Sequence, residues 1–371
     1  MQATETSTPT PLPTSGIGAP MCLLTQVHGL HADAAAHWAS ALRASPRAVQ
    51  YLNARGIGGA IAARFGLGCA RAAWRDLGGV LERHGEDAVA ASGLVAHGSG
   101  DATAKCSSGF DRFRDRIMFP IRSRDGQIAG FGGRLIEPDG AASTRGSGAK
   151  AGRQMTPRGF EPPKYLNSPE GIAFDKGRLL YGLFEAEAAI KAQGLAVVVE
   201  GYFDVVSLAQ AGFEVAVATL GTACRREQLV ELLTASARMV FCFDGDAAGR
   251  AAAARALLAA LPFATDARSF GFVFLPEGHD PDSFVRVHGV QAFRAMVDGA
   301  IPLDGFLVEH AGQGCDLGCA EGKARCAAQA RGLWRELAQG EAREALLDHC
   351  AAMLGFRRAE LLAMWVGWAK A

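Results

Sequence analysis

The sequence predicts an α/β chain, α+β overall, in which a parallel-sheet domain lies between a basic, mixed α/β N-terminal subdomain and a helical C-terminal subdomain. Three observations favour this organisation. Short apolar segments alternate with helical ones after residue 195, an Asp-Gly pair joins two apolar runs before it, and the chain after residue 290 has helical spacing. We therefore expect a disordered leader followed by three subdomains, over residues 1–32, 33–190, 191–290 and 291–371.

The first part of the chain changes from proline-rich to helical. Residues 1–20 contain four prolines with Thr, Ser and Gly, which is typical of a disordered segment. From Asp33 to Leu94 apolar residues recur at helical spacing. This part predicts helices and no recognisable chemistry.

A hairpin and an insertion follow. Asp125 and Gly126 separate the apolar runs 117–121 and 128–136, and Asp-Gly between two such runs is a hairpin signal. Residues 137–160 are rich in Gly, Ser and Arg and predict an exposed insertion or loop.

The sheet domain is predicted from continuous apolar strands, a pattern typical of parallel sheets covered on both faces. The strands are expected at 196–200, 215–220, 239–243 and 271–275, and the helices between them near 204–211, 225–236 and 247–261.

Composition excludes several classes of protein. Lys and Arg number 38, as do Asp and Glu, so a histone-like binder that relies on bulk charge is excluded. Nine cysteines without paired spacing indicate reduced thiols. The first basic residue is Arg43, so a signal peptide is not indicated, and apolar runs are far shorter than the ~18 residues that span a bilayer. We expect a cytoplasmic protein without a membrane partner.

Familiar catalytic motifs are also missing from the sequence. It contains no P-loop, no G-x-S-x-G and no H-E-x-x-H. Cys315, Cys319 and Cys326 are not spaced as a zinc site, so we expect no zinc in this chain.

The charges are unevenly distributed. Residues 105–178 hold 14 Lys and Arg against 8 Asp and Glu, whereas residues 185–309 hold 9 against 16. Ordinary solvated faces can produce such blocks. The alternative is a phosphate-binding half beside a half whose carboxylates bind cations.

Acidic residues follow three of the predicted strands, where the ligand sites of open parallel sheets form. They are Glu200 with Asp204, Asp244 with Asp246, and Asp280 with Asp282. Carboxylates gathered in one crevice repel one another unless a divalent cation neutralises them, and hard oxygen ligands suit Mg²⁺ or Mn²⁺. Each pair also has a plainer interpretation. Asp246 can be a helix N-cap, and Asp280-Pro-Asp282 is a common turn.

The sequence resembles the catalytic core of bacterial DnaG-type primases. The motifs that carry the resemblance occur in the family's order: DRFRDRIMFPI (111–121), GFGGR (130–134), PKYLNSPE (163–170), KGRLLYGL (176–183), VVEGYFDVVSLAQAG (198–212), ATLGTA (218–223), FDGDAAGR (243–250) and LPEGHDPDSFV (275–285). The resemblance covers about residues 33–310 and continues more weakly to the end. It implies a Toprim fold within 191–290.

The resemblance also implies an activity and a site. The expected reaction is metal-assisted synthesis of short RNA primers on single-stranded DNA from ribonucleoside triphosphates, in the bacterial cytoplasm, with two or more Mg²⁺ or Mn²⁺ ions. The catalytic residues are then Glu200, Asp244 and Asp246, and Asp204, Asp280 and Asp282 complete the metal-binding set. The nucleotide- and template-binding residues are Arg112, Arg134, Lys164, Asn167 and Lys176.

Two alternatives and two departures accompany this interpretation. A nuclease or topoisomerase with the same acidic site is one alternative, and a degraded core that only binds DNA is the other. The family's zinc-ribbon pattern is not found in the sequence. The family's helicase-binding domain is also expected to be missing, which puts helicase binding in doubt.

Overall fold

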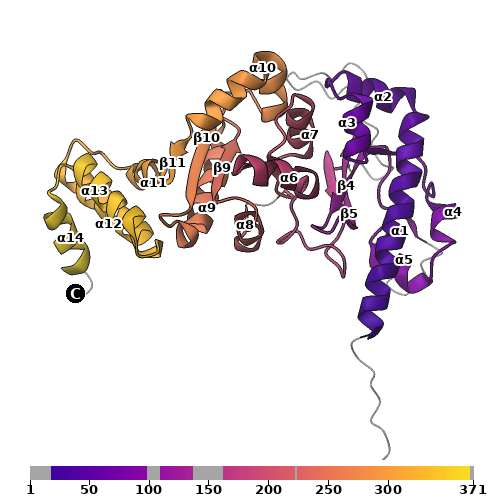
Figure 1. Cartoon of the computed structure of the whole chain (residues 1–371), viewed down its shortest axis with the longest axis horizontal. Coiled ribbons are helices and arrows are strands. Elements are labelled where there is room, and N and C mark those ends of the chain that lie inside the picture. The colour runs from indigo at the N-terminus through magenta and orange to yellow at the C-terminus, as the bar shows by residue number, and fades with distance from the viewer. Residues whose placement is uncertain (1–17, 98–108, 137–161, 222–223, 368–371) are drawn as a thin grey trace, which may run out of the picture.

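The computed structural model describes residues 18–97, 109–136, 162–221 and 224–367. A mixed N-terminal part, a parallel sheet and a helical C-terminal part follow one another along the long axis of the molecule (Figure 1). This arrangement confirms the predicted fold class. Residues 1–17 of the expected leader and the expected insertion at 137–160 lie outside the described residues.

The described structure begins within the segment that we expected to be a disordered leader. Helix α1 (Gly18–Arg43) already includes residues 18–32. Val27, Leu30 and Ala34 are fully buried and lie three or four positions apart, so one face of the helix packs on the core. Composition placed the start of the first helix too late in the chain. The helical spacing of the apolar residues from Val27 onward is the better guide to where the helix runs than the prolines that precede it.

The N-terminal subdomain contains a four-stranded antiparallel sheet in the order β1-β4-β5-β6, and a separate pair of strands, β2 and β3. Gly126 has a φ of 84° in the β4–β5 turn, and the predicted hairpin is confirmed. The elements after α1 are α2 (Pro46–Asn53), α3 (Gly59–Arg64), β1 (Gly68–Ala70), α4 (Gly78–Leu81), α5 (Glu86–Ser92), β2 (Val95–Ala96), β3 (Phe110–Asp111), β4 (Arg116–Arg122), β5 (Ile128–Leu135) and β6 (Tyr165–Asn167).

The glycines of β5 are explained by packing. A Cβ at Gly130 would lie 2.4 Å from the Phe174 ring, and a Cβ at Gly132 would lie 2.4 Å from the Tyr202 ring. Tyr202 belongs to the parallel-sheet domain, so the glycines let an aromatic side chain of that domain approach the N-terminal sheet.

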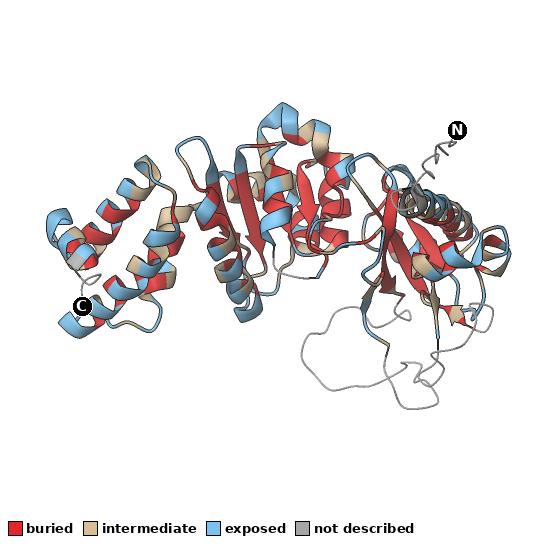
Figure 2. Ribbon diagram, turned by 90° about the horizontal axis from the view of Figure 1, so that it is seen from below, coloured by how far each residue is buried: buried red, intermediate tan, exposed pale blue. Residues whose placement is uncertain are grey.

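The parallel-sheet domain has the strand order β11-β10-β9-β7-β8, in which only β11 is antiparallel. Helices α7 and α10 lie on one side of the sheet and α8 and α9 on the other (Figure 1). The strands between them are largely buried (Figure 2). The elements are α6 (Leu183–Gln193), β7 (Leu195–Val199), α7 (Tyr202–Gln210), β8 (Ala216–Ala218), α8 (Arg226–Leu233), β9 (Arg238–Phe243), α9 (Ala247–Ala260), the 3₁₀ turn η2 (Leu261–Phe263), β10 (Ser269–Phe274), α10 (Pro281–Asp298) and β11 (Ile301–Pro302).

The last described residues form four helices, in the part that the sequence predicts to be helical: α11 (Leu303–Gly312), α12 (Ala320–Glu336), α13 (Glu341–Leu354) and α14 (Arg358–Gly367). Phe306 of α11 packs on Phe272 of β10 with ring centroids 4.5 Å apart, so the sheet and the helices share one core. Within the described ranges, no helix combines the length and the apolar character that crossing a membrane requires.

Candidate active site at the carboxyl edge of the parallel sheet

The order of the parallel strands reverses beside β7. From β7 the chain crosses to β8 on one side, and it then passes to β9 on the other side of β7. In open α/β sheets, ligands bind outside the carboxyl ends of the strands at such a switch. Glu200 directly follows β7 and Asp244 directly follows β9. The topology therefore brings these two carboxylates to the ends of neighbouring strands.

Two glycines fix the turn that carries Asp244 and Asp246. A Cβ at Gly245 would lie 2.1 Å from the carbonyl oxygen of Leu275, in the loop after β10. A Cβ at Gly249 would lie 2.1 Å from the carbonyl oxygen of Asp244. Both partners are backbone atoms, so no side-chain rotation could relieve either contact. The turn that carries Asp244 and Asp246 therefore packs closely against the loop after β10. We refer to Glu200, Asp244 and Asp246 together as the acidic edge.

Asp246 also caps helix α9. Its Oδ1 accepts a hydrogen bond of 2.8 Å from the backbone N–H of Gly249. The N-cap interpretation therefore describes an actual contact. It does not exclude a second role, because Oδ2 takes no part in this bond.

Asp204 and Asp280 are engaged at the starts of helices. Asp204 is 7% exposed, and its Oδ2 and Oδ1 accept from the N–H groups of Gly201 at 2.9 Å and Asp282 at 3.2 Å. Asp280 caps α10, and its Oδ1 accepts from the N–H of Ser283 at 2.8 Å. The Asp204 carboxylate therefore ties the start of α7 to the start of α10, whereas the bond of Asp280 stays within the start of α10. Asp282 is buried and paired with arginines.

The carboxylates in this region are close enough to affect one another. Partial burial raises the pKa of the Glu200 carboxyl. The negative charge of Asp246 raises this pKa further, whereas the positive charge of Arg255 lowers it. Burial raises the pKa of Asp204 well above its usual value, and the charges of Asp280 and Asp244 add to this. A cation near the acidic edge would relieve this repulsion.

The donor chemistry of the acidic edge fits a hard divalent cation, because all three side chains offer carboxylate oxygens. The three carboxylates do not converge on one point in this structure. In the parts of the chain that the structure describes, no group of three or more His, Cys, Asp or Glu side chains is arranged to hold a metal ion.

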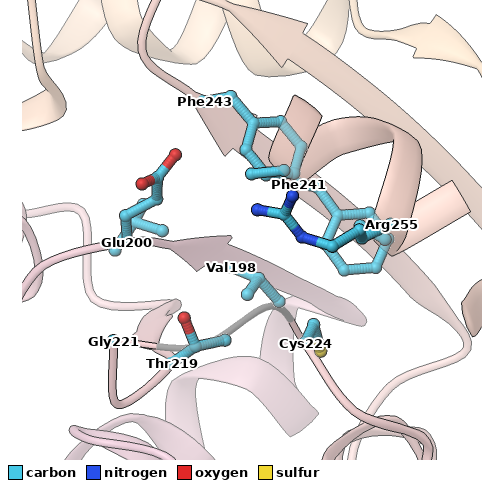
Figure 3. Close-up of a pocket in the computed structure, with 11 residues that line it drawn as sticks. Val198, Glu200, Thr219, Gly221, Cys224, Phe241, Phe243 and Arg255 are labelled. Atoms are coloured by element: carbon cyan, nitrogen blue, oxygen red, sulfur yellow. The ribbon is translucent and has the colours of Figure 1, made fainter. Parts of the chain in front are cut away.

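A pocket of about 240 Å³ opens beside Glu200, between the sheet and α9 (Figure 3). Its walls are mainly apolar, and Thr219 and Arg255 add polar groups. The Arg255 guanidinium points into the pocket on the side that faces Glu200 (Figure 3). Sequence reasoning missed Arg255 because an arginine in an alanine-rich helix looks like any solvated helix residue.

The predicted basic residues occupy different environments. Lys164 is exposed and Lys176 is half-buried. Arg134 is only 6% exposed, and its Nη1 donates to the Tyr165 hydroxyl at 2.5 Å. The Arg112 Nε donates to the Gly93 carbonyl at 3.0 Å, and burial lowers the pKa of its guanidinium. The structure therefore does not place all of these side chains on one open surface.

Asn167 joins the two domains. Its Oδ1 accepts from the Tyr202 hydroxyl at 2.6 Å, and its Nδ2 donates to the Leu220 carbonyl at 3.1 Å. Asn167 ends β6, whereas Tyr202 starts α7 and Leu220 lies just after β8. The predicted nucleotide-binding asparagine thus lies where the N-terminal sheet meets the parallel-sheet domain.

Arg116 is a buried residue that sequence reasoning missed. It is 3% exposed, and its guanidinium donates to the carbonyl groups of Gly133 at 3.1 Å, Lys164 at 3.2 Å and Pro163 at 2.7 Å. Burial lowers its pKa to about 10. These contacts hold the backbone of Lys164 against β5. In the sequence, nothing distinguishes Arg116 from the neighbouring arginines of DRFRDR.

An aromatic cluster around Arg114, which the sequence did not indicate, lies on the surface of the N-terminal subdomain. The Arg114 guanidinium is 4.2 Å from the ring centroid of Trp74 and 4.7 Å from that of Phe110. Trp74 is 62% exposed. An exposed tryptophan beside an arginine is the combination that proteins use to stack single-stranded bases.

Comparison with known proteins assigns a family to each of the three parts of the chain. Residues 37–187 match the family described as the DNA primase catalytic core, N-terminal domain, and residues 197–285 match a Toprim-like family. Residues 305–359 match the DnaB-helicase binding domain of primase.

Individual relatives are similar over most of the chain. A DNA primase of Neisseria meningitidis is 42% identical over 288 residues, which are 77% of this chain and 44% of that protein. The chain therefore spans less than half the length of this curated relative. A DNA primase domain from Pseudomonas aeruginosa is 38% identical with a TM-score of 0.78, over 90% of this chain and 98% of that one. A DnaG primase catalytic domain bound to single-stranded DNA is 34% identical, also with a TM-score of 0.78, over 92% and 99%.

One of these matches corrects the sequence analysis. We expected no helicase-binding domain and assigned residues 291–371 to a helical part of the core, whereas residues 305–359 match such a domain. Helices α11 to α13 lie within or across this range. The segment carries no motif of reactive side chains. Its apolar residues at helical spacing, among them the buried Leu346 and Leu347, are typical of many helical domains and did not indicate this one.

Proposed function

Because this chain belongs to the bacterial DnaG-type DNA primase family, we propose that it synthesises short RNA on single-stranded DNA from ribonucleoside triphosphates. The observation that carries the proposal is the acidic edge at the switch point of the sheet, next to a basic subdomain joined to it through Asn167 and Tyr202. The reaction is the attack of a 3′-hydroxyl on the α-phosphate of the incoming nucleotide, with pyrophosphate as the leaving group.

Glu200, Asp244 and Asp246 are the residues that would hold Mg²⁺ or Mn²⁺, with Asp280 and Asp204 beside them. When bound, such ions lower the pKa of the attacking hydroxyl and stabilise charge on the transferred phosphoryl group. The protein itself supplies positioning and electrostatics, so no protein nucleophile is needed.

Basic side chains of the N-terminal subdomain would bind the phosphates. We assign phosphate binding to Lys164, Lys176, Arg112 and Arg134, and contact with the nucleotide to Asn167. The binding of single-stranded DNA reported for a similar catalytic domain supports a template of the same kind here. Counterion release makes such binding weaken with salt.

We assign a DnaB-type helicase as the partner of residues 305–359, on the strength of the family match over those residues. We prefer the primase assignment to the topoisomerase alternative, because the N-terminal and C-terminal matches on either side of the Toprim-like region are both to parts of primases.

The test is incorporation of labelled ribonucleotides on single-stranded templates, with and without an annealed primer, in Mg²⁺ or Mn²⁺. We expect Asp244→Asn to abolish incorporation and Lys164→Ala to raise the nucleotide or template requirement. Asp298→Asn is the control, because Asp298 is an exposed carboxylate outside the acidic edge, with a side chain 74% exposed. Normal incorporation by Asp244→Asn would refute the proposal. DNA binding that does not depend on salt would refute the assignment of phosphate binding to the basic residues.

A further inference from the structure

Asp282 is enclosed by hydrogen-bond donors from three parts of the chain. Its Oδ1 accepts from the Ser207 hydroxyl at 2.7 Å and from Arg286 Nε at 2.9 Å. Its Oδ2 accepts from Arg286 Nη2 at 3.2 Å and from Arg55 Nη1 at 3.0 Å. The residue is 2% exposed. Ser207 lies in α7, Arg286 in α10, and Arg55 between α2 and α3 of the N-terminal subdomain.

These contacts leave the carboxylate no free position for a cation. An ionised carboxylate offers about four lone-pair sites, and four donors occupy them here. Two of the donor groups are guanidinium ions, which form the stronger, charge-assisted hydrogen bonds. A metal ion at Asp282 would have to displace them and would leave their positive charges beside it.

We propose that Asp282 is not a metal ligand but a positioning residue that locks the N-terminal subdomain onto helices α7 and α10. This inference rests on the proposed function for its catalytic consequence. The lock is the ion pair between Arg55 and Asp282, which joins residues 227 positions apart in the sequence. The Arg55 guanidinium also lies 4.7 Å from the ring centroid of Phe203 in α7, so the arginine contacts both helices that the lock connects.

The lock matters because the two halves of the proposed site lie on opposite sides of it. Helix α7 starts at Tyr202, directly after Glu200 and the N-cap Gly201. A shift of α7 would therefore also move Glu200, which belongs to the acidic edge. Arg55 belongs to the subdomain that carries the phosphate-binding residues. Misplacing reacting groups by about 1 Å can lower a rate by roughly a hundredfold, so a loose interface would slow the reaction without removing any metal ligand.

The test compares Arg55→Met and Asp282→Asn with Arg294→Met as the matched control. Arg294 also stacks on a phenylalanine, at 5.0 Å from the Phe213 ring centroid, but its hydrogen bond to Gly212 stays within the parallel-sheet domain. Mn²⁺ binding without nucleotide is measured by electron paramagnetic resonance, with Asp244→Asn as the reference for a lost ligand. Primer extension is measured at saturating template and nucleotide, and coupling between Arg55 and Asp282 by a double-mutant cycle of urea unfolding.

We expect Arg55→Met to leave Mn²⁺ affinity within about twofold and to lower the extension rate about tenfold or more, with partial rescue by Arg55→Lys. The two substitutions should be non-additive in unfolding, because both remove the same contact. If Asp282→Asn fails to fold, Arg55→Met carries the test, since it leaves Asp282 paired with Arg286.

Two results would overturn the inference: a loss of Mn²⁺ affinity in Asp282→Asn as large as in Asp244→Asn, or an extension rate of Arg55→Met equal to that of Arg294→Met. Failure of the proposed function looks different. In that case the unsubstituted chain extends no primer, whereas the unfolding cycle still decides whether the Arg55–Asp282 lock exists.

Discussion

Replacing Asp246 by Asn and by Ala separates its two roles. The Asp246 Oδ1 caps α9 through the N–H of Gly249 at 2.8 Å. Asn keeps an oxygen in the same position and ranks with Asp as an N-cap, whereas Ala removes the cap at a cost of about 0.5–2 kcal/mol. Asn also removes the charge. That change forfeits roughly 0.3–1 kcal/mol of favourable interaction with the helix dipole. It also removes the repulsion by Asp246 that adds to the effect of burial in raising the pKa of Glu200.

The free energy of unfolding of Asp246→Asn should therefore lie within about 1 kcal/mol of the unsubstituted chain, and Asp246→Ala should be about 0.5–2 kcal/mol less stable. Both substitutions should abolish nucleotide incorporation, because both remove the carboxylate. Stability is read from urea unfolding midpoints, and activity from primer extension well below the melting temperature.

A cap remote from the site provides the control for stability. Ser45 caps α2 through the N–H of Ala48 at 3.3 Å, so Ser45→Ala should lower stability by a similar amount and leave primer extension intact. Full activity in Asp246→Asn would refute the metal-binding role and leave only the cap. Unchanged stability in Asp246→Ala would show that the cap contributes nothing.

Three further outcomes are expected. Gly245→Ala should lower the free energy of unfolding by about 1–3 kcal/mol and slow primer extension, because the new Cβ would lie 2.1 Å from a backbone oxygen. Gly332→Ala is the control: a Cβ there would have no atom within 4 Å and should stabilise α12 by up to about 1 kcal/mol. Equal urea midpoints for the two variants would contradict this prediction. Arg116→Lys should raise the nucleotide KM as Lys164→Ala does and add nothing in the Lys164→Ala background; an additive double variant would show that Arg116 does not act through Lys164. Burial lowers the pKa of His31 in the folded state, so the unfolded state binds more protons and stability falls as pH drops below about 6.5. In His31→Gln the loss of urea midpoint between pH 7.5 and 5.5 should shrink, and an unchanged loss would assign the pH dependence elsewhere.

The sheet was predictable from local sequence because buried parallel strands are continuous apolar runs, and the acidic residues that follow them stand out for the same reason. The contacts of the site were not predictable in this way. Asp282 looks like Asp280 in the sequence, and only the approach of Arg55 from 227 positions away gives it a different environment. Arg116 likewise gains its three carbonyl partners through sheet pairing and through the chain near Pro163. Side chains whose roles depend on distant partners carry no local signal.

Helix α7 has a consequence for the modularity of the protein. Every residue from Tyr202 to Ala209 is buried, although a helix at the surface of an independent domain would keep one polar face. Its second apolar face is covered by the N-terminal subdomain, for instance where the Tyr202 ring stacks on Phe119 of β4 with centroids 5.4 Å apart. Cutting the chain near residue 190 would expose that face to water, and exposed apolar patches of this kind favour aggregation. We therefore expect the N-terminal subdomain and the parallel-sheet domain to fold and unfold as one unit.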